Sequence, residues 1–126
     1  MLTEKGHDVE DMGGDGGRVE YPVIAKKVGH AVADNEGSRG ILICGTGIGM
    51  SLCANKVHGI RAACCSDTFS ARMTRMHNNS NVLCLGARVV GAGLALDLVD
   101  LFLNTEFEGD RHIKRIEKVM PIESNQ

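Results

Sequence analysis

The stretch GILICGTGIGMSLCANK, residues 40–56, decides the fold class. It joins a short apolar run at 41–44 to three glycines at every second position, and helix-forming residues follow from about Gly49 to Val57. An apolar run without alternation, followed by a turn and a helix, is typical of a strand that is buried on both faces of a parallel sheet. The stretch therefore predicts one strand and helix of an α/β fold, with Cys44 at the end of the strand.

The same order of strand and helix continues along the chain. The patterns predict a weak strand at 7–12, a flexible loop at 13–18, a helix from about Pro22, strands at 41–44, 60–65 and 81–86, helices at 49–57, 69–77 and 93–104, and a basic helix at 110–119. We expect a single domain over 1–126 with a Rossmann-like, three-layer αβα fold: a parallel sheet between two layers of helices, plus the C-terminal basic helix.

Composition excludes several classes of protein. The net charge is −2, so no electrostatic surface for nucleic acid is expected, and one Tyr, three Phe and no Trp leave no platform for stacking bases. The apolar runs are far shorter than the ~20 residues of a membrane span, and the first residues are polar, unlike a secretory signal. We therefore expect a cytoplasmic protein that binds neither nucleic acid nor membrane.

The cysteines indicate a reducing compartment. There are five of them, and they form neither a CxxC pair nor a Cys/His spacing typical of zinc ligands. This pattern argues against a disulfide framework and against structural zinc. Apart from Cys44, the cysteines are expected to be core residues: Cys53, Cys64, Cys65 and Cys84.

The turn CGTGIGM can be interpreted in three ways. A dinucleotide site would need GxGxxG with an acidic residue near the end of the next strand; Gly45, Gly47 and Asp67 fit, but Met50 replaces the third glycine. Alternatively, the backbone N–H groups form a nest for an anion or oxyanion, which would also favour a Cys44 thiolate. In the third interpretation the glycines only allow tight packing, and Cys44 is one more core residue.

Thr46 and several polar residues outside the turn also leave alternatives open. Thr46 is either a helix cap or a hydroxyl that moves a proton. His77 and Asn78 are either ordinary residues at a helix end or a general acid or base with a hydrogen-bond donor for a ligand. Arg111 and Arg115 are four residues apart and share one helix face, where they either clamp an anion or belong to the solvated surface.

The topology of a doubly wound sheet puts some of these residues together. Ligands bind beyond the carboxyl ends of parallel strands, which places 44–49, 65–67 and 86–88, including Arg88, on one rim. A base beside an oxyanion nest, with a histidine and several arginines, would suit proton transfer next to the carbonyl of a phosphorylated sugar. The motifs permit this chemistry without requiring it.

Longer motifs carry a specific resemblance. Through VEYPVIAKKV, RGILICGTGIGMSLCANKVHGIRAACCSD, SARMTRMHNNSNVLCLGARVVG and NTEFEGDRHIKRIEKV, the chain resembles the type B ribose-5-phosphate isomerases, relatives of the galactose-6-phosphate isomerase subunits. The resemblance covers nearly every residue from about Gly6 to Val119. It implies a homodimer or homotetramer that interconverts ribose 5-phosphate and ribulose 5-phosphate through an enediolate, without metal or cofactor.

The resemblance also implies roles for individual residues. Cys44 matches the proton-abstracting base, Thr46 a hydroxyl that assists proton movement, and His77 the residue that opens the sugar ring. The substrate-binding positions are Tyr21 at the pocket border, the loop residues Gly45, Gly47, Ile48 and Gly49, and the contacts Asn78, Arg88, Arg111 and Arg115. In the family each pocket is shared across the dimer, so His77 and the C-terminal arginines would face the Cys44 loop of the partner chain.

The chain departs from the family pattern in four places. EYP, HNN and GDRH replace the more usual DYP, HND and GGRH, and the last change puts Asp110 beside the phosphate clamp. Family members also begin with a strand, an Asp-His pair in a turn and a first helix, and we expect the strand, the Asp-His pair and most of that helix to be missing here. This departure favours an alternative, a non-catalytic sugar-phosphate-binding or subunit-type protein.

Overall fold

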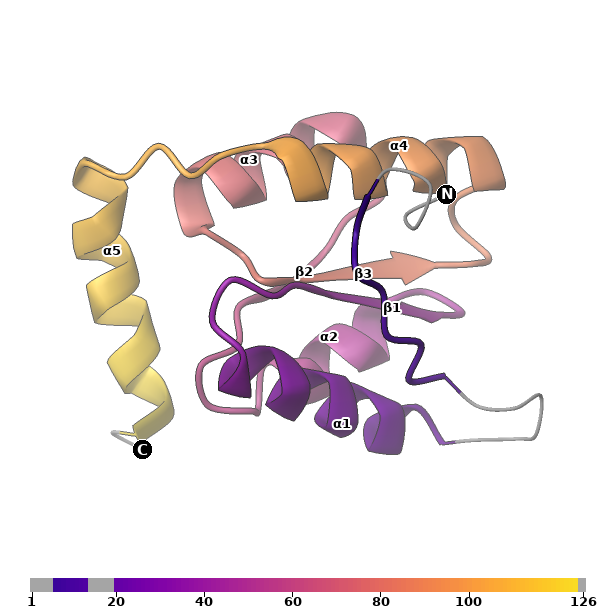
Figure 1. The fold of residues 1–126 in the computed structure, drawn as a ribbon, viewed down its shortest axis with the longest axis horizontal. Coiled ribbons are helices and arrows are strands. Elements are labelled where there is room, and N and C mark those ends of the chain that lie inside the picture. The colour runs from indigo at the N-terminus through magenta and orange to yellow at the C-terminus, as the bar shows by residue number, and fades with distance from the viewer. Residues whose placement is uncertain (1–5, 14–19, 125–126) are drawn as a thin grey trace.

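The computed structural model describes residues 6–13 and 20–124, and its elements alternate as an α/β fold requires (Figure 1). In chain order they are α1 (Tyr21–Asp34), β1 (Gly40–Cys44), α2 (Ile48–Ala54), β2 (Ala62–Cys64), α3 (Thr68–Asn78), β3 (Val82–Gly86), α4 (Ala92–Asn104), α5 (Arg111–Val119) and the 3-10 helix η1 (Met120–Ser124). The predicted fold class is confirmed. Helix and strand bounds differ from the predicted ones by up to three residues, and η1 was not predicted.

The three described strands form one parallel sheet in the order β1-β3-β2. Gly40 pairs with Val82 and Cys44 with Gly86, so β1 and β3 run in step over their whole length. On the other side of β3, Cys64 pairs with Cys84. This register brings the carboxyl ends of the strands to one edge of the sheet, as the rim prediction required.

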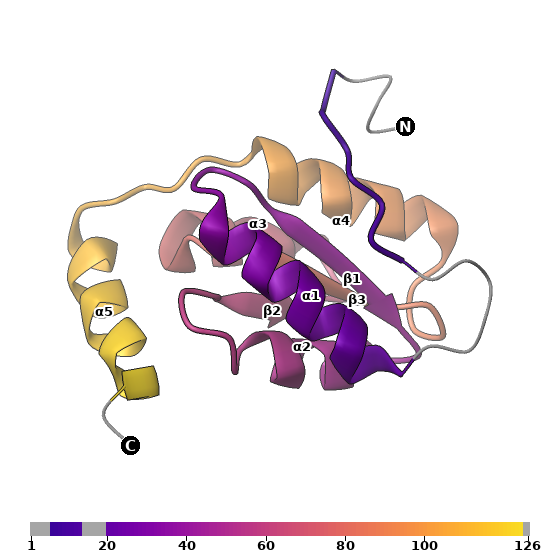
Figure 2. The same ribbon diagram turned by 60° about the horizontal axis from the view of Figure 1, so that its bottom comes forward.

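Helices cover both faces of the sheet (Figure 2). In β3, Val82 and Cys84 point into a core shared with α1 and α2, whereas Leu83 and Leu85 point into a second core shared with α4 and the start of α3. All four side chains are 1% exposed or less, because a central strand of a three-layer fold has no solvent face. The predicted three layers are confirmed, and α5 lies beside them at one end of the sheet (Figure 1).

Local signals explain where the helices begin. Pro22 occupies the first turn of α1, where its missing N–H costs nothing. Asp67 precedes α3, and its Oδ1 accepts a hydrogen bond from the Ser70 N–H at 2.7 Å. Of the helices described, none combines the length and the apolar character needed to cross a lipid bilayer.

Three predictions about the chain are wrong. β1 is not buried on both faces, since Ile43 is 56% exposed at the edge of the described sheet. Residues 7–12 form no strand: none of them pairs with a described strand, Val9 is 48% exposed, and only Met12 packs on the core. An extended segment becomes a strand only where a neighbour accepts its ladder hydrogen bonds. Cys64 is exposed rather than in the core, because it ends the short edge strand β2 and the chain turns inward only at Cys65. The predicted loop at 13–18 lies outside the described residues except for Gly13.

Candidate active site

Cys44 lies at the carboxyl end of β1, directly before the glycine turn. Its Sγ accepts a hydrogen bond from the Gly47 N–H at 3.2 Å, and Gly47 is buried with a φ of 82°. Only glycine adopts this conformation without strain, so the turn can fold back and present an N–H group to the sulfur. This hydrogen bond holds the Cys44 sulfur against the turn, next to the exposed residues Thr46 and Ile48.

The hydroxyl of Thr46 serves the same turn. Its Oγ1 accepts a hydrogen bond from the Ile48 N–H at 3.2 Å, although Gly47 rather than Thr46 is the residue that precedes α2. Thr46 and Ile48 are both exposed on the rim, and the Gly49 backbone follows them in the first turn of the helix. Thr46 is thus well placed both to hold the turn and to meet a ligand.

Tyr21 and Arg88 border the turn from two other elements. A Cβ on Gly49 would lie 2.8 Å from Tyr21 Cε2 and Cζ, so the tyrosine ring packs directly on the glycine backbone. The Arg88 N–H donates to the Gly45 carbonyl at 3.0 Å, and its side chain passes over Gly45. The structure therefore brings the N-terminus of α1, the Cys44 turn and the loop after β3 into one group, which we call the rim cluster.

The other thiols near the rim are unsuited to act as bases. Burial raises the pKa of Cys65 to about 11, with smaller contributions from Asp67 and Cys64. Burial likewise raises the pKa of Cys84 to about 12. The exposed Cys64 lies under the turn, with its Sγ 3.5 Å from the Thr46 carbonyl oxygen, and burial followed by the neighbouring Cys44 raises its pKa as well.

A second group of predicted residues lies at the opposite end of the sheet. His77 is in the last turn of α3, and its ring stacks on that of His112 in α5 with centroids 4.4 Å apart. Arg111 and Arg115 are exposed in the same helix. Asn78, at the end of α3, completes this second group, which we call the amino-end cluster. His112 was not predicted as a site residue from the sequence. Its position in the first turn of a basic helix, next to Arg111, is the signal that could have made it a candidate.

The two clusters cannot meet within one chain. Helix α3 starts after the carboxyl end of β2 and runs back to the amino end of β3, so His77 and Cys44 lie at opposite ends of the sheet (Figure 1). The five residues of β1 alone span about 13 Å at ~3.3 Å per residue. The structure thus assembles the predicted residues as two separate halves.

Arg75 holds the turn that carries the amino-end cluster. It is 4% exposed, and its Nη1 donates to the Ser80 carbonyl at 2.6 Å and to Asn79 Oδ1 at 2.8 Å. Burial, reinforced by the nearby Arg39 and Arg61, lowers the pKa of Arg75 to about 10, so the guanidinium stays charged at neutral pH. Asn79 itself has a φ of 49°, which ends α3 and turns the chain into β3.

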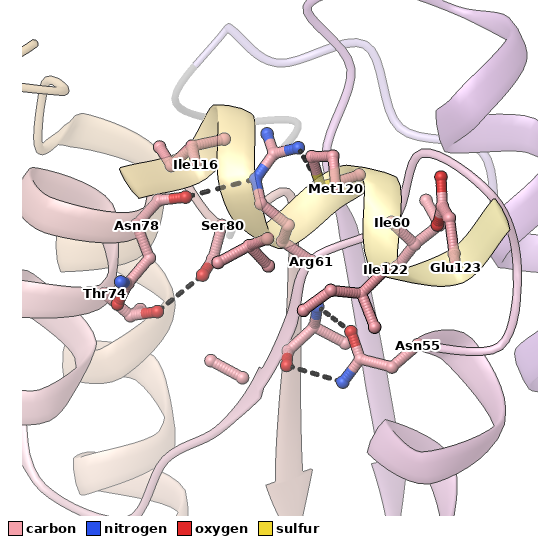
Figure 3. A pocket seen from close by; sticks show the side chains of 13 residues that line it. Asn55, Ile60, Arg61, Thr74, Asn78, Ser80, Ile116, Met120, Ile122 and Glu123 are labelled. Atoms are coloured by element: carbon pink, nitrogen blue, oxygen red, sulfur yellow. Dashed lines mark hydrogen bonds between the residues drawn. The ribbon is translucent and has the colours of Figure 1, made fainter. Parts of the chain in front are cut away.

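Two cavities of the described structure contain little of either cluster. A cavity of about 530 Å³ lies between α5, η1 and the sheet, and Figure 3 shows Asn78 and Arg61 on its wall. Arg61 Nε donates to the Asn78 carbonyl at 3.1 Å, and Met120 closes the other side. A second cavity of about 660 Å³ lies between α1 and α2 and includes none of the predicted residues. Cys44 is not among the residues that line either of these two cavities.

Comparisons with known proteins show the family of the chain. The family model described as Ribose/Galactose Isomerase matches residues 1–119. The chain belongs to this isomerase family. It is 48% identical over 126 residues to ribose-5-phosphate isomerase B of Escherichia coli, covering 99% of this chain and 85% of that protein.

Solved structures of the isomerase family match the fold closely. Ribose-5-phosphate isomerase B of Clostridium thermocellum is 51% identical, with a TM-score of 0.95 over 98% of this chain and 84% of its own. The Mycoplasma genitalium enzyme, solved with bound ribulose-5-phosphate, is 40% identical with a TM-score of 0.94, over 99% of this chain and 84% of its own. The chain is thus an enzyme of the isomerase family by sequence and by fold.

One departure from the family pattern carries backbone strain. Asp110 has a φ of 51° and a ψ of −126°, in the position where the family pattern has glycine. This conformation is costly for a residue with a side chain.

We expect Asp110→Gly to raise the free energy of unfolding by about 1 kcal/mol. Urea unfolding would measure the change, and Asp110→Asn is the matched control because it removes the charge and keeps the side chain. Equal stabilisation by both substitutions would show that charge, not backbone strain, limits stability there.

Proposed function

We propose that this chain interconverts ribose 5-phosphate and ribulose 5-phosphate, with Cys44 as the base. The observation that carries the proposal is the Gly47 N–H to Cys44 Sγ hydrogen bond in the exposed rim turn. Relatives that cover almost the whole chain carry the name of this activity, which supports the choice of substrate. The alternative is a protein that binds sugar phosphates without converting them.

The proposed reaction moves one proton between two carbons. The Cys44 thiolate takes the proton from C2 of the open-chain aldose, and the electron pair forms the enediolate double bond between C1 and C2. Backbone N–H groups from Gly45 to Gly49 hold the enediolate oxygens, and the Thr46 hydroxyl moves a proton from the oxygen on C2 to the oxygen on C1. Return of the proton from Cys44 to C1 gives the ketose.

We further propose that two copies of the chain complete each site. His77 of one subunit opens the sugar ring, Asn78 contacts the substrate, and Arg111 and Arg115 hold its phosphate beside the rim cluster of the other subunit. The separation of the two clusters in one chain supports this arrangement. Arg88 and Tyr21 then line the pocket from the Cys44 side. Arg88 keeps its contact with Gly45, and Tyr21 keeps its contact with Gly49.

Isotope exchange tests the proposed reaction. In deuterated water, the chain is expected to convert ribose 5-phosphate to ribulose 5-phosphate and to introduce deuterium at the carbon that receives the proton, as followed by NMR. A control with heat-unfolded protein measures the uncatalysed exchange. Substrate binding without any exchange would instead support the non-catalytic alternative.

Mixing two inactive variants tests the shared site. Cys44→Ala and His77→Asn are each expected to be inactive alone. After unfolding and refolding together, mixed dimers would carry one site with both native residues, so roughly a quarter of the wild-type activity should return if subunits pair at random. Variants refolded separately and then combined provide the control. No recovery in mixed dimers would place Cys44 and His77 in the same chain's site.

A further inference from the structure

Three side chains that can bind a metal ion meet where α3 approaches the start of α5. They are His77 at the end of α3, Glu108 in the segment before α5, and His112 in its first turn. One donor atom from each residue lies within 4.8 Å of the donor atoms of the other two. The end of α3 and the stretch that leads into α5 thus converge on a small volume.

The nitrogen of His112 that faces this volume lacks a hydrogen bond. His112 is 3% exposed, and its Nε2 makes no hydrogen bond with any described residue. Glu108 Oε2 lies 3.3 Å from this nitrogen, close enough for an ion pair but not in hydrogen-bonding geometry. A buried polar atom without a partner is unfavourable, and a bound cation would satisfy both the nitrogen and the carboxylate.

Backbone hydrogen bonds already hold these two stretches in place. The Glu108 N–H donates to the Met76 carbonyl at 3.1 Å, one residue before His77. The His112 N–H donates to the Gly109 carbonyl at 3.0 Å, which fixes the start of α5 next to Glu108. The Glu108 side chain is 43% exposed and can therefore rotate toward the histidines without opening the core. Little rearrangement is needed to bring the three ligands together.

The chemistry of these ligands suits zinc. Imidazole nitrogens are borderline ligands that suit Zn²⁺, and two histidines with one glutamate are a known zinc ligand set. Three protein ligands with an open fourth position are typical of Zn²⁺ sites that are not structural. Tetrahedral bonds of ~2.0–2.2 Å place donor atoms about 3.3 Å apart, so the longest separation here must close by roughly 1.5 Å. We propose that His77, Glu108 and His112 form a Zn²⁺-binding site.

Occupation of this site would inhibit the enzyme. A nitrogen of His77 that is bonded to Zn²⁺ has no lone pair left to exchange a proton with the sugar ring. Inhibition should be reversible, because a chelator removes the ion. This consequence rests on the proposed role of His77 in ring opening, whereas the binding itself does not.

Spectroscopy with Co²⁺, which takes zinc sites and absorbs visible light, tests the binding. The native chain is expected to bind one Co²⁺ with a tetrahedral absorption spectrum, to release it on addition of Zn²⁺, and to show no thiolate-to-cobalt charge-transfer band. Glu108→Gln and His112→Gln should each weaken binding at least ~10–100-fold. Glu106→Gln is the matched control, because Glu106 lies in the same segment outside the group.

The outcomes separate this site from the proposed function. Unchanged Co²⁺ affinity of the Glu108→Gln variant, or a thiolate charge-transfer band in the native chain, would overturn the zinc site. This test holds even if His112→Gln fails to fold. Neither result would contradict the isomerase proposal. Binding at this site with the expected variant effects, but without loss of isomerase activity at saturating Zn²⁺, would support the site and contradict the role of His77. Inhibition of the isomerase activity by Zn²⁺ that is relieved in Glu108→Gln would support both the zinc site and the proposed role of His77.

Discussion

Cys44→Ala is expected to lower kcat by roughly 10²–10⁴-fold, the usual contribution of a general base. The substitution removes the sulfur that accepts the Gly47 N–H and that faces the rim. Substrate binding should persist, since the arginines and the loop amides remain. Steady-state kinetics would give kcat, and calorimetry with ribose 5-phosphate would give Kd.

Cys64→Ala is the matched control for this prediction. Cys64 lies against the same turn, yet its thiol approaches the Thr46 carbonyl and receives no N–H group in the described contacts. We expect its removal to leave kcat within a few-fold of the wild-type value. Equal losses in both variants would show that packing under the turn, rather than a base at Cys44, limits the reaction. Full activity of Cys44→Ala would rule out Cys44 as the base.

Gly86→Ala is expected to damage both stability and catalysis. A Cβ on Gly86 would lie 2.6 Å from the Thr46 carbonyl carbon and oxygen, both of them backbone atoms that cannot rotate away. Relief of this contact requires the whole turn to move. We expect the free energy of unfolding to fall by about 1–3 kcal/mol, as for other overpacked sites. A shift of ~1 Å in Thr46 should also lower kcat by roughly 10²-fold.

Urea unfolding and kinetics on the same preparation would test both effects. Gly93→Ala provides the control, because a Cβ there meets no atom within 4 Å in the first turn of α4. We expect it to be neutral or slightly stabilising, since alanine is the better helix former. A Gly86→Ala variant with native stability and native kcat would mean that the turn tolerates displacement.

Apolar patterning was sufficient to predict the layers but not all of the strands. The runs that became β1 and β3 carry no polar residue, which predicted strands covered on both faces. β3 is indeed buried on both faces, whereas β1 is not, because Ile43 is 56% exposed. Residues 7–12, HDVEDM, contain only two apolar residues and were predicted as a weak strand, and no described strand lies beside them to pair with. Pairing depends on a distant segment, so a pattern within six residues could not reveal its absence. Likewise, the strand order β1-β3-β2 follows from packing rather than from any local signal.

The candidate site was predictable in one half only. Topology alone brought Cys44 and Arg88 to one rim, because both follow strands of one parallel sheet. Local patterns made His77 and Arg111 candidates, the resemblance implied their roles, and the distance between them and Cys44 became visible only with the fold. Glu108 and His112 were missed, although their spacing of four residues is one at which side chains commonly meet.

The central position of β3 also has a consequence for the order of folding during synthesis. β3 is the last of the three described strands to leave the ribosome, yet both β1 and β2 pair with it and not with each other. Contacts of long sequence separation form slowly, and unpaired strands expose edges that invite aggregation. Among the described strands, β1 and β2 therefore complete their pairing only after Gly86 has emerged.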